Sequence, residues 1–266
     1  MMKGQQEQYI KEKAKERYGK IALTGNSDCC CVPGECCNDN NISSRPSAIE
    51  STKFIGYDTK DIDSIPEASI LGVGCGAPTK FADIRQGEVV VDLGSGAGID
   101  VFLAANKVGN SGKVIGVDMT DEMLEKARKN ASDNGYTNVE FVKGDIERKV
   151  PVEDNIADLV ISNCVINLTA DKVSTFKEIH RILKNGGGRI LISDLVTDRE
   201  ISQDSISSDK WCSCIDGALT KENYLDSIRK AGFQTVDVLE EKVYIDDQVD
   251  SEKRTISSIV IKAVKN

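Results

Sequence analysis

Three glycines at alternate positions follow a short β-branched run that ends in an acid. Residues 89–91 are all valine, Asp92 comes next, and Gly94, Gly96 and Gly98 follow. Because glycine has no Cβ and tolerates positive φ, such a loop can turn sharply and let a nucleoside approach its backbone. The dinucleotide fingerprint has a different spacing, G-x-G-x-x-G, and an acid ahead of it would repel a phosphate. The pattern favours a nucleoside with a cationic amino group, such as S-adenosylmethionine.

Further side chains suited to a nucleoside stand where the next predicted strands end. Asp118, followed by Met119, closes the second strand and is placed to accept hydrogen bonds from ribose hydroxyls. Asp145 and Ile146 follow the third strand, where a carboxylate and an apolar side chain can flank an adenine. Asn163 ends the fourth strand. Because ligands of open α/β sheets bind beyond the carboxyl ends of the strands, we expect these residues to contact S-adenosylmethionine.

Three cysteines lie in segments that a nucleotide-binding fold does not itself require. Cys75 is in a glycine-rich loop before the core, Cys164 follows the fourth strand, and Cys214 lies in a late insertion. Taken singly, each is readily explained as a small buried hydrophobic residue. Loops are poor places for core thiols, however. Three convergent thiolates would form a soft trigonal site for a thiophilic ion, whereas hard metals prefer oxygen ligands.

These residues need a framework of alternating strands and helices to bring them together. Besides the run at 89–91, strands are predicted at 113–117, 139–142, 157–162, 189–193 and 257–264, and helices at 6–18, 99–107, 172–183 and 222–231. Gly19 is expected to end the first helix, and residues 43–66 to form an irregular connector. The alternation predicts an α/β fold with a mostly parallel sheet and helices on both faces.

The chain divides into three predicted parts. Residues 1–66 hold an N-terminal helix and a cysteine-rich connector. Residues 67–195 form the nucleotide-binding α/β core, and residues 196–266 carry an insertion and the final strands of the sheet. Cys214 belongs to this last part, so the third part is expected to contribute to the site.

Composition narrows the expected ligands to small molecules. The chain has 266 residues and a net charge of −9 without a basic cluster, which argues against a nucleic-acid partner. No run approaches the roughly 18 apolar residues of a membrane span, so we expect no membrane contact. The nine cysteines come without a signal-peptide core. They therefore fit a cytoplasmic protein with reduced thiols better than a secreted disulfide scaffold.

Six segments give the chain a resemblance to a known family, the arsenite S-adenosylmethionine methyltransferases. They are residues 17–20 (RYGK), 71–78 (LGVGCGAP), 91–98 (VDLGSGAG), 116–120 (GVDMT), 161–168 (ISNCVINL) and 214–219 (CIDGAL). The glycine loop is common to many methyltransferases, whereas the segments around Cys164 and Cys214 are far more selective. The resemblance runs from about Tyr18 to Gly232. It implies the class I, Rossmann-like methyltransferase fold, with S-adenosylmethionine as the methyl donor.

The resemblance also implies an activity and a set of thiols. In this family the cysteines matching Cys164 and Cys214 hold trivalent arsenic, and the one matching Cys75 joins them or forms a disulfide with an N-terminal cysteine. The candidates for that N-terminal, redox-active partner are Cys29, Cys30 and Cys31. The implied substrates are arsenite and methylarsenite, with electrons supplied by thiols and a protein disulfide reduced by thioredoxin or glutathione. The cysteines without a clear family counterpart are Cys36, Cys37 and Cys212.

Two other interpretations stay open. The core motifs fit equally well a methyltransferase that acts on a carbon of a quinone or a sterol-like lipid, but that activity leaves the three cysteines unexplained. A thiol-based metalloid-binding protein without turnover would suit the cysteine-dense N-terminal segment. It would, however, give no role to an intact nucleotide pocket.

Overall fold

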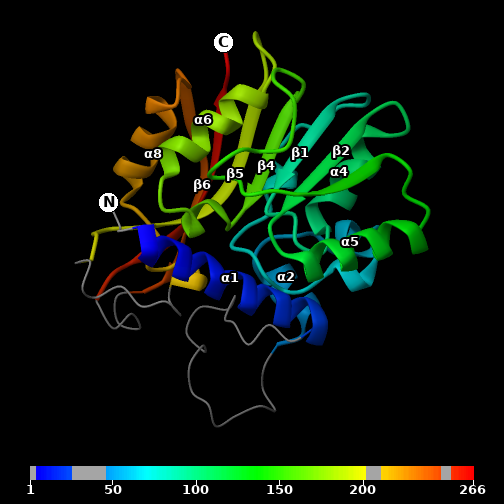
Figure 1. The fold of residues 1–266 in the computed structure, drawn as a ribbon, viewed down its shortest axis with the longest axis horizontal. Helices are drawn as coiled ribbons and strands as arrows, with labels where there is room; N and C mark the ends of the chain where they lie inside the picture. Colours follow the sequence, from blue (N-terminus) through cyan, green and yellow to red (C-terminus); the bar gives the residue numbers. More distant parts are fainter. Residues whose placement is uncertain (1–3, 26–45, 202–210, 247–252) are drawn as a thin grey trace.

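The computed structural model describes residues 4–25, 46–201, 211–246 and 253–266. Its centre is a seven-stranded sheet in the order β3-β2-β1-β4-β5-β7-β6 (Figure 1). The strands are β1 Val89–Leu93, β2 Lys113–Asp118, β3 Val139–Lys143, β4 Leu159–Asn163, β5 Arg189–Thr197, β6 Thr235–Ile245 and β7 Ile256–Val264. Among these strands β7 alone runs in the opposite direction, so that it pairs antiparallel with both β5 and β6. The predicted α/β fold with a mostly parallel sheet is confirmed.

Helices cover both faces of this sheet. They are α1 Gly4–Thr24, α2 Ala48–Phe54, α3 Thr59–Asp63, α4 Ile99–Val108, α5 Asp121–Asp133, α6 Lys172–Ile182 and α8 Lys221–Lys230. On one face α6 and α8 bury Phe176 and Tyr224 against the strands, and on the other α4 and α5 bury Phe102 and Leu124. Each face has its own apolar core because successive strand residues point to opposite sides. None of the described helices has both the length and the apolar composition to cross a membrane.

The connector predicted at 43–66 is wrong, because α2 and α3 form within it. Ser47 caps α2 and accepts a hydrogen bond from the Glu50 backbone N–H, while the Glu50 carboxylate accepts one from the Ser47 N–H. This reciprocal pair is a capping box, which satisfies N–H groups that the first turn leaves without partners. The S-x-x-E spacing at 47–50 was therefore a helix signal.

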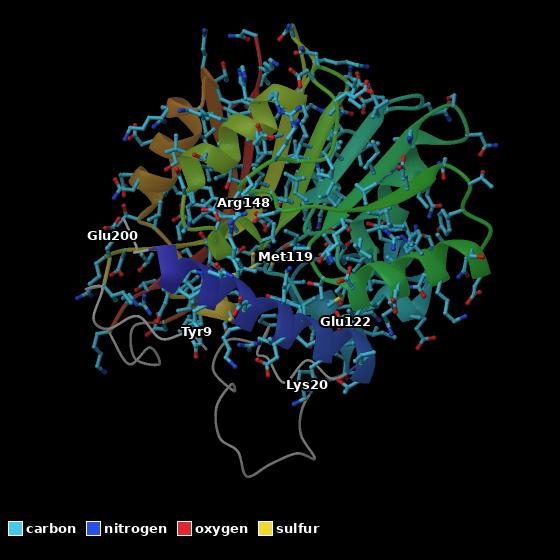
Figure 2. The ribbon with its side chains drawn as sticks, viewed as in Figure 1. Tyr9, Lys20, Met119, Glu122, Arg148 and Glu200 are labelled. Carbon is cyan, nitrogen blue, oxygen red and sulfur yellow. The ribbon has the colours of Figure 1, made fainter. Side chains whose placement is uncertain are left out.

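The predicted end of the first helix at Gly19 is also wrong, because α1 continues to Thr24. Gly19 is buried inside the helix where α1 packs on α5. A Cβ at this position would lie 3.1 Å from the Glu122 carboxylate of α5. Figure 2 shows Glu122 beside the end of α1 that carries Lys20. Glycine here serves the close approach of two helices and does not terminate one.

Strand β6 pairs with β7 along the edge of the sheet, and the sequence did not predict it. Its residues Glu240, Glu241 and Lys242 break the apolar alternation that marks a half-buried strand. An edge strand tolerates such charges because one side of it faces solvent. β5 also runs four residues past the predicted end at 193, to Thr197.

Candidate active site

A pocket lies at the carboxyl ends of the parallel strands. All but one of the predicted cofactor residues line it, namely Asp92, Gly94, Gly96, Asp118, Met119, Asp145, Ile146 and Asn163. The exception is Gly98, which stands at the start of α4 with a φ of 101°. A Cβ at Gly98 would lie 2.7 Å from the ring of Phe102. Packing against α4 therefore requires glycine at this position.

The glycine loop turns tightly against its neighbours and leaves one polar atom in need of a partner. Gly94 has a φ of 74°, and a Cβ there would lie 2.6 Å from the side chain of Val165. The next residue, Ser95, lines the pocket, and its Oγ is buried without a hydrogen-bond partner among the described residues. A buried hydroxyl without a partner costs free energy. The loop therefore fits a ligand that brings a polar group to Ser95.

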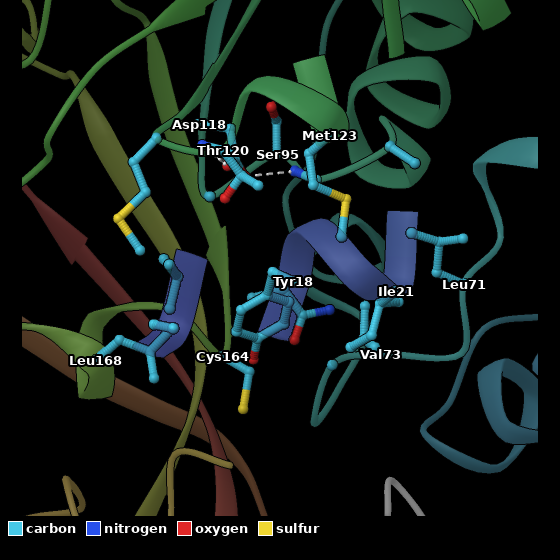
Figure 3. Close-up of a pocket in the computed structure, with 18 of the residues that line it drawn as sticks. Tyr18, Ile21, Leu71, Val73, Ser95, Asp118, Thr120, Met123, Cys164 and Leu168 are labelled. Atoms are coloured by element: carbon cyan, nitrogen blue, oxygen red, sulfur yellow. Dashed lines mark hydrogen bonds between the residues drawn. The ribbon is translucent and has the colours of Figure 1, made fainter. Parts of the chain in front are cut away.

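Asp118 organises the loop from the end of β2. Its carboxylate accepts hydrogen bonds from the backbone N–H of Gly96 at 2.9 Å and of Thr120 at 2.8 Å (Figure 3). Burial raises the pKa of Asp118, and these backbone hydrogen bonds oppose the rise. A carboxylate oxygen has more than one lone pair, so the group can also accept hydrogen bonds from ligand hydroxyls. This arrangement fits the predicted ribose-binding role.

A second acid, Asp100, joins Asp92 in the wall of the pocket. Burial raises the pKa of Asp92 well above its usual value, and the neighbouring charges of Asp100 and Asp118 add to the rise. Asp100 accepts hydrogen bonds from Tyr57 Oη at 2.7 Å and from Thr79 Oγ1 at 3.2 Å. Neighbouring buried carboxylates favour a bound cation. Sequence reasoning missed Asp100, although an acid in the first turn after the glycine loop was visible.

The ionisation of Asp100 gives a testable dependence of stability on pH. Burial raises the pKa of Asp100 from 3.8 to about 6. A group with a raised folded-state pKa stabilises the fold below its unfolded pKa and loses that contribution as the pH rises through its folded pKa. Relative to Asp100→Asn, the wild type should lose about 3 kcal/mol of unfolding free energy between about pH 4 and about pH 7. Urea unfolding across this range measures the difference, and parallel pH profiles would contradict the assignment.

Helix α1 forms a wall of the pocket that sequence reasoning did not foresee. Its lining residues are Lys11, Ala14, Arg17, Tyr18 and Ile21, and Figure 3 shows α1 crossing the pocket with Tyr18 near Cys164. Lys11 Nζ lies 3.0 Å from an Asp145 oxygen and 2.6 Å from a Glu147 oxygen. These two ion pairs join α1 to the segment after β3. In the sequence, the RYGK match at 17–20 was the one signal that α1 belongs to the pocket.

Cys164 and Cys214 bring two thiols to the pocket wall. Both residues have left-handed backbone conformations, with φ of 59° and 64°. This region costs a residue with a Cβ about 1–2 kcal/mol, and such strain gathers at functional sites. The Sγ of Cys214 donates a hydrogen bond to the Cys164 carbonyl oxygen at 2.8 Å. Two strained turns therefore aim neighbouring thiols at the same region.

Cys75 supplies the third thiol from behind this wall. It is buried, is not among the pocket-lining residues, and its Sγ lies 3.8 Å from Ser193 Oγ. Hydrogen bonds with the thiols of Cys214 and Cys75, together with burial, raise the pKa of Cys164 well above its usual value. The Cys164 thiol therefore contacts both other predicted thiols, while the compact cluster of possible ligand atoms contains Cys75 and Cys164 but not Cys214.

A buried carboxylate that sequence reasoning missed lies beside the thiols. An oxygen of Asp194 and the Sγ atoms of Cys75 and Cys164 all lie within 4.8 Å of one another. Asp194 accepts hydrogen bonds from the Leu195 backbone N–H at 2.9 Å and from Tyr224 Oη at 3.0 Å. Burial raises the pKa of Asp194 to about 6. Its place on β5, far along the chain from both thiols, gave no local signal.

The Cys214 segment is anchored by a buried ion pair. Arg254 Nη2 lies 2.9 Å from an Asp216 oxygen, and the two side chains are 1% and 0% exposed. Removing one member of such a pair leaves a buried charge without its counterion and costs about 3 to 5 kcal/mol. Asp216→Ala should lower the free energy of unfolding by that amount, as measured by urea denaturation. The control is Asp226→Ala in the exposed Lys230–Asp226 pair, which should change it by less than about 1 kcal/mol.

The remaining cysteines of the sequence analysis fall into two groups. The cysteines Cys29, Cys30, Cys31, Cys36 and Cys37 lie outside the described residues. Cys212 is buried, and its carbonyl oxygen accepts a hydrogen bond from Tyr18 Oη at 3.3 Å. The proposed redox role of residues 29–31 therefore stays a prediction.

Comparisons with known proteins identify the family of this chain. A family model described as a methyltransferase domain matches residues 84–232. An arsenic(III) S-adenosylmethionine methyltransferase structure from Chlamydomonas reinhardtii is similar at 33% identity and a TM-score of 0.64, over 84% of this chain and 75% of that one. The chain belongs to the arsenite methyltransferase family. The class I, Rossmann-like methyltransferase fold implied by the resemblance is thereby confirmed.

Curated members of the family are similar over a shorter part of their length. The arsenite methyltransferase of Halobacterium salinarum is 42% identical over 236 residues, which is 86% of this chain and 58% of that protein. The human arsenite methyltransferase is 36% identical over 154 residues, 54% of this chain and 40% of that protein. This chain thus spans about half the length of the curated relatives that it matches.

Proposed function

We propose that this protein transfers the methyl group of S-adenosylmethionine to trivalent arsenic held by Cys75, Cys164 and Cys214. The observation that carries the proposal is the contact of the Cys164 thiol with those of Cys75 and Cys214, beside a pocket that contains a glycine loop and two buried acids. The names of the relatives at 33% and 42% identity support it. A carbon acceptor would need no such thiols.

In this proposal each part of the pocket binds one part of the methyl donor. Asp118 accepts hydrogen bonds from the ribose, Asp145 and Ile146 flank the adenine, and Asp92 with Asp100 faces the cationic end. When bound, the donor supplies a sulfonium methyl group that a nucleophile can take. Fixing two reactants in a productive geometry removes about 7 kcal/mol or more from a barrier. The residues of the pocket therefore act mainly by positioning.

The thiols are suited to arsenite without a general base. As each As–S bond forms, an As–OH bond breaks, and the thiol proton joins the departing hydroxide as water. Binding of one arsenite by three thiols thus releases three water molecules. Because each thiol proton leaves in that water, the raised pKa of Cys164 does not prevent binding. Arsenic keeps its lone pair in the trigonal product. Because Cys164 and Cys214 line the pocket, an arsenic atom on them would face the methyl donor.

One incubation tests the proposed function. The protein is mixed with methyl-labelled S-adenosylmethionine, a thiol reductant and arsenite, and the arsenic species are separated by chromatography. Label in methylarsenite and dimethylarsenite is the expected result. Bound arsenite without labelled product would favour a metalloid-binding protein. Label transferred to a quinone or sterol but not to arsenite would favour a carbon methyltransferase.

We further propose that the N-terminal thiols act in redox recycling, with thioredoxin or glutathione as the reductant. A site of free thiols requires reducing conditions, so the cytoplasm is the compartment that we propose. With Cys29, Cys30 and Cys31 all changed to serine, arsenite should bind with nearly unchanged affinity. Thiol-driven turnover should stall after about one cycle, because no protein thiol reduces the oxidised product. Sustained turnover by this triple variant at the wild-type rate would contradict the proposed recycling role.

A further inference from the structure

The third thiol depends on a hydrogen-bond chain that begins in the cofactor pocket. Cys75 belongs to the loop at 71–78, and its backbone N–H donates to Asn163 Oδ1 at 3.1 Å. The Asn163 Nδ2 group donates to the Gly76 carbonyl oxygen at 2.7 Å. One amide thus holds the loop on both sides of the Cys75 side chain. Because Asn163 directly precedes Cys164, it links the third thiol to the second.

Tyr57 connects this amide to the pocket. Its Oη accepts a hydrogen bond from Asn163 Nδ2 at 2.9 Å and donates one to Asp100 Oδ2 at 2.7 Å. Tyr57 is 4% exposed and Asp100 3% exposed, so water does not compete freely for either bond. Asp100 lines the pocket and Tyr57 does not. The hydroxyl therefore transmits the state of Asp100 to a residue that holds Cys75.

The bond directions in this chain are fixed from both ends, and the two ends agree. The Cys75 N–H can only donate and the Gly76 carbonyl oxygen can only accept, which orients the Asn163 amide, while an ionised Asp100 can only accept. A carboxylate only accepts, so Tyr57 must donate to it. The Tyr57 oxygen is then free to accept from the Asn163 NH₂ group in the same orientation that directs the amide oxygen to the Cys75 N–H. A cation in the pocket favours the ionised form of Asp100. A cationic ligand and a correctly held Cys75 are thus mutually stabilising.

We propose that Tyr57 is a positioning residue that couples occupancy of the cofactor pocket to the availability of the Cys75 thiol for arsenite. The inference rests on the proposed function, because it takes trivalent arsenic as the ligand of the three thiols. A cationic methyl donor strengthens the Asp100–Tyr57–Asn163 chain and thereby the third sulfur ligand. By linkage, arsenite on three thiols strengthens donor binding by the same factor. Methylarsenite has two exchangeable positions and needs only two thiols, so its affinity should not depend on occupancy of the cofactor pocket.

The test is a binding measurement on Tyr57→Phe in the full chain. The affinities for arsenite and methylarsenite are measured with and without sinefungin, a non-reactive analogue with an amine in place of the sulfonium centre. In the wild type, sinefungin should tighten arsenite binding about 10-fold, within the usual range for coupled sites. In Tyr57→Phe this gain should vanish for arsenite, and methylarsenite binding should match the wild type. X-ray absorption should count three sulfur ligands on arsenic in the wild type and two in the variant.

The matched control is Tyr136→Phe, since Tyr136 packs on Phe102 away from the thiols and its variant should keep the full gain. Asp100→Asn provides a second variant if Tyr57→Phe does not fold, because a neutral amide has no ionised form for a bound cation to favour. With sinefungin at a saturating concentration for this variant, so that weaker sinefungin binding is not the cause, the gain should be lost as well. Three sulfur ligands and an unchanged gain in either variant would overturn the inference. Absence of methyl transfer by the wild type would instead reject the proposed function, since the coupling is measured by binding.

Discussion

Cys164→Ser should abolish methylation of both arsenite and methylarsenite. The substitution leaves at most two thiols at the site, and a serine hydroxyl is a poor ligand for a thiophilic ion. Loss of an outer-shell partner already weakens metal sites about 10- to 100-fold, so loss of a direct ligand should lower turnover by at least about 100-fold. Cys164 has a φ of 59°, and serine meets the same backbone cost as cysteine. The fold should therefore persist, as circular dichroism would show.

Two further variants make this prediction specific. Cys212→Ser removes a buried thiol from the same segment as Cys214 but leaves the three proposed ligands intact, so it should retain turnover of both substrates. Cys75→Ser should stop methylation of arsenite and spare that of methylarsenite, which needs only two thiols. Arsenic speciation during turnover measures all of these effects. Normal turnover of both substrates by Cys164→Ser would show that arsenic is bound at another site.

Asp118→Ala should weaken S-adenosylmethionine binding by about 100-fold or more while arsenite still binds. Asp118 accepts hydrogen bonds from the backbone N–H groups of Gly96 and Thr120, and its remaining lone pairs are proposed for the ribose. Hydrogen bonds to a charged group contribute about 1.5–3 kcal/mol each, so losing two or more accounts for that factor. The thiols come from other segments and should keep their affinity for arsenite.

Isothermal titration with S-adenosylmethionine and with arsenite separates the two effects. The control is Asp121→Ala, because Asp121 is exposed and pairs with Lys143 at the surface. That variant should bind both ligands as the wild type does. Unchanged donor affinity in Asp118→Ala would remove the ribose assignment, and a matching loss of arsenite binding would indicate that the fold of the site had collapsed.

The fold and the lining of the pocket were largely predictable because their signals are local. The valine run before Asp92, the glycines after it, and the acids at the ends of β2 and β3 stand within a few residues of the elements that they mark. Errors arose where one local signal had two meanings. Gly19 resembled a helix stop but permits close packing of α1 on α5, and the charges of β6 concealed a strand because that strand lies at an edge.

By itself the sequence determined the α/β fold and the nucleotide loop, since each depends on residue type and short spacing, and it predicted the three thiols from the segments that carry them. Tertiary structure alone decided how these parts meet. Asn163 holds Cys75 from 88 residues away, Tyr57 reaches Asp100 across 43 residues, and Asp194 arrives beside the thiols from β5. The place of α1 over the pocket is of the same kind. Such contacts join residues that are far apart in the sequence and depend on how the whole chain packs, so they cannot be predicted from a short segment.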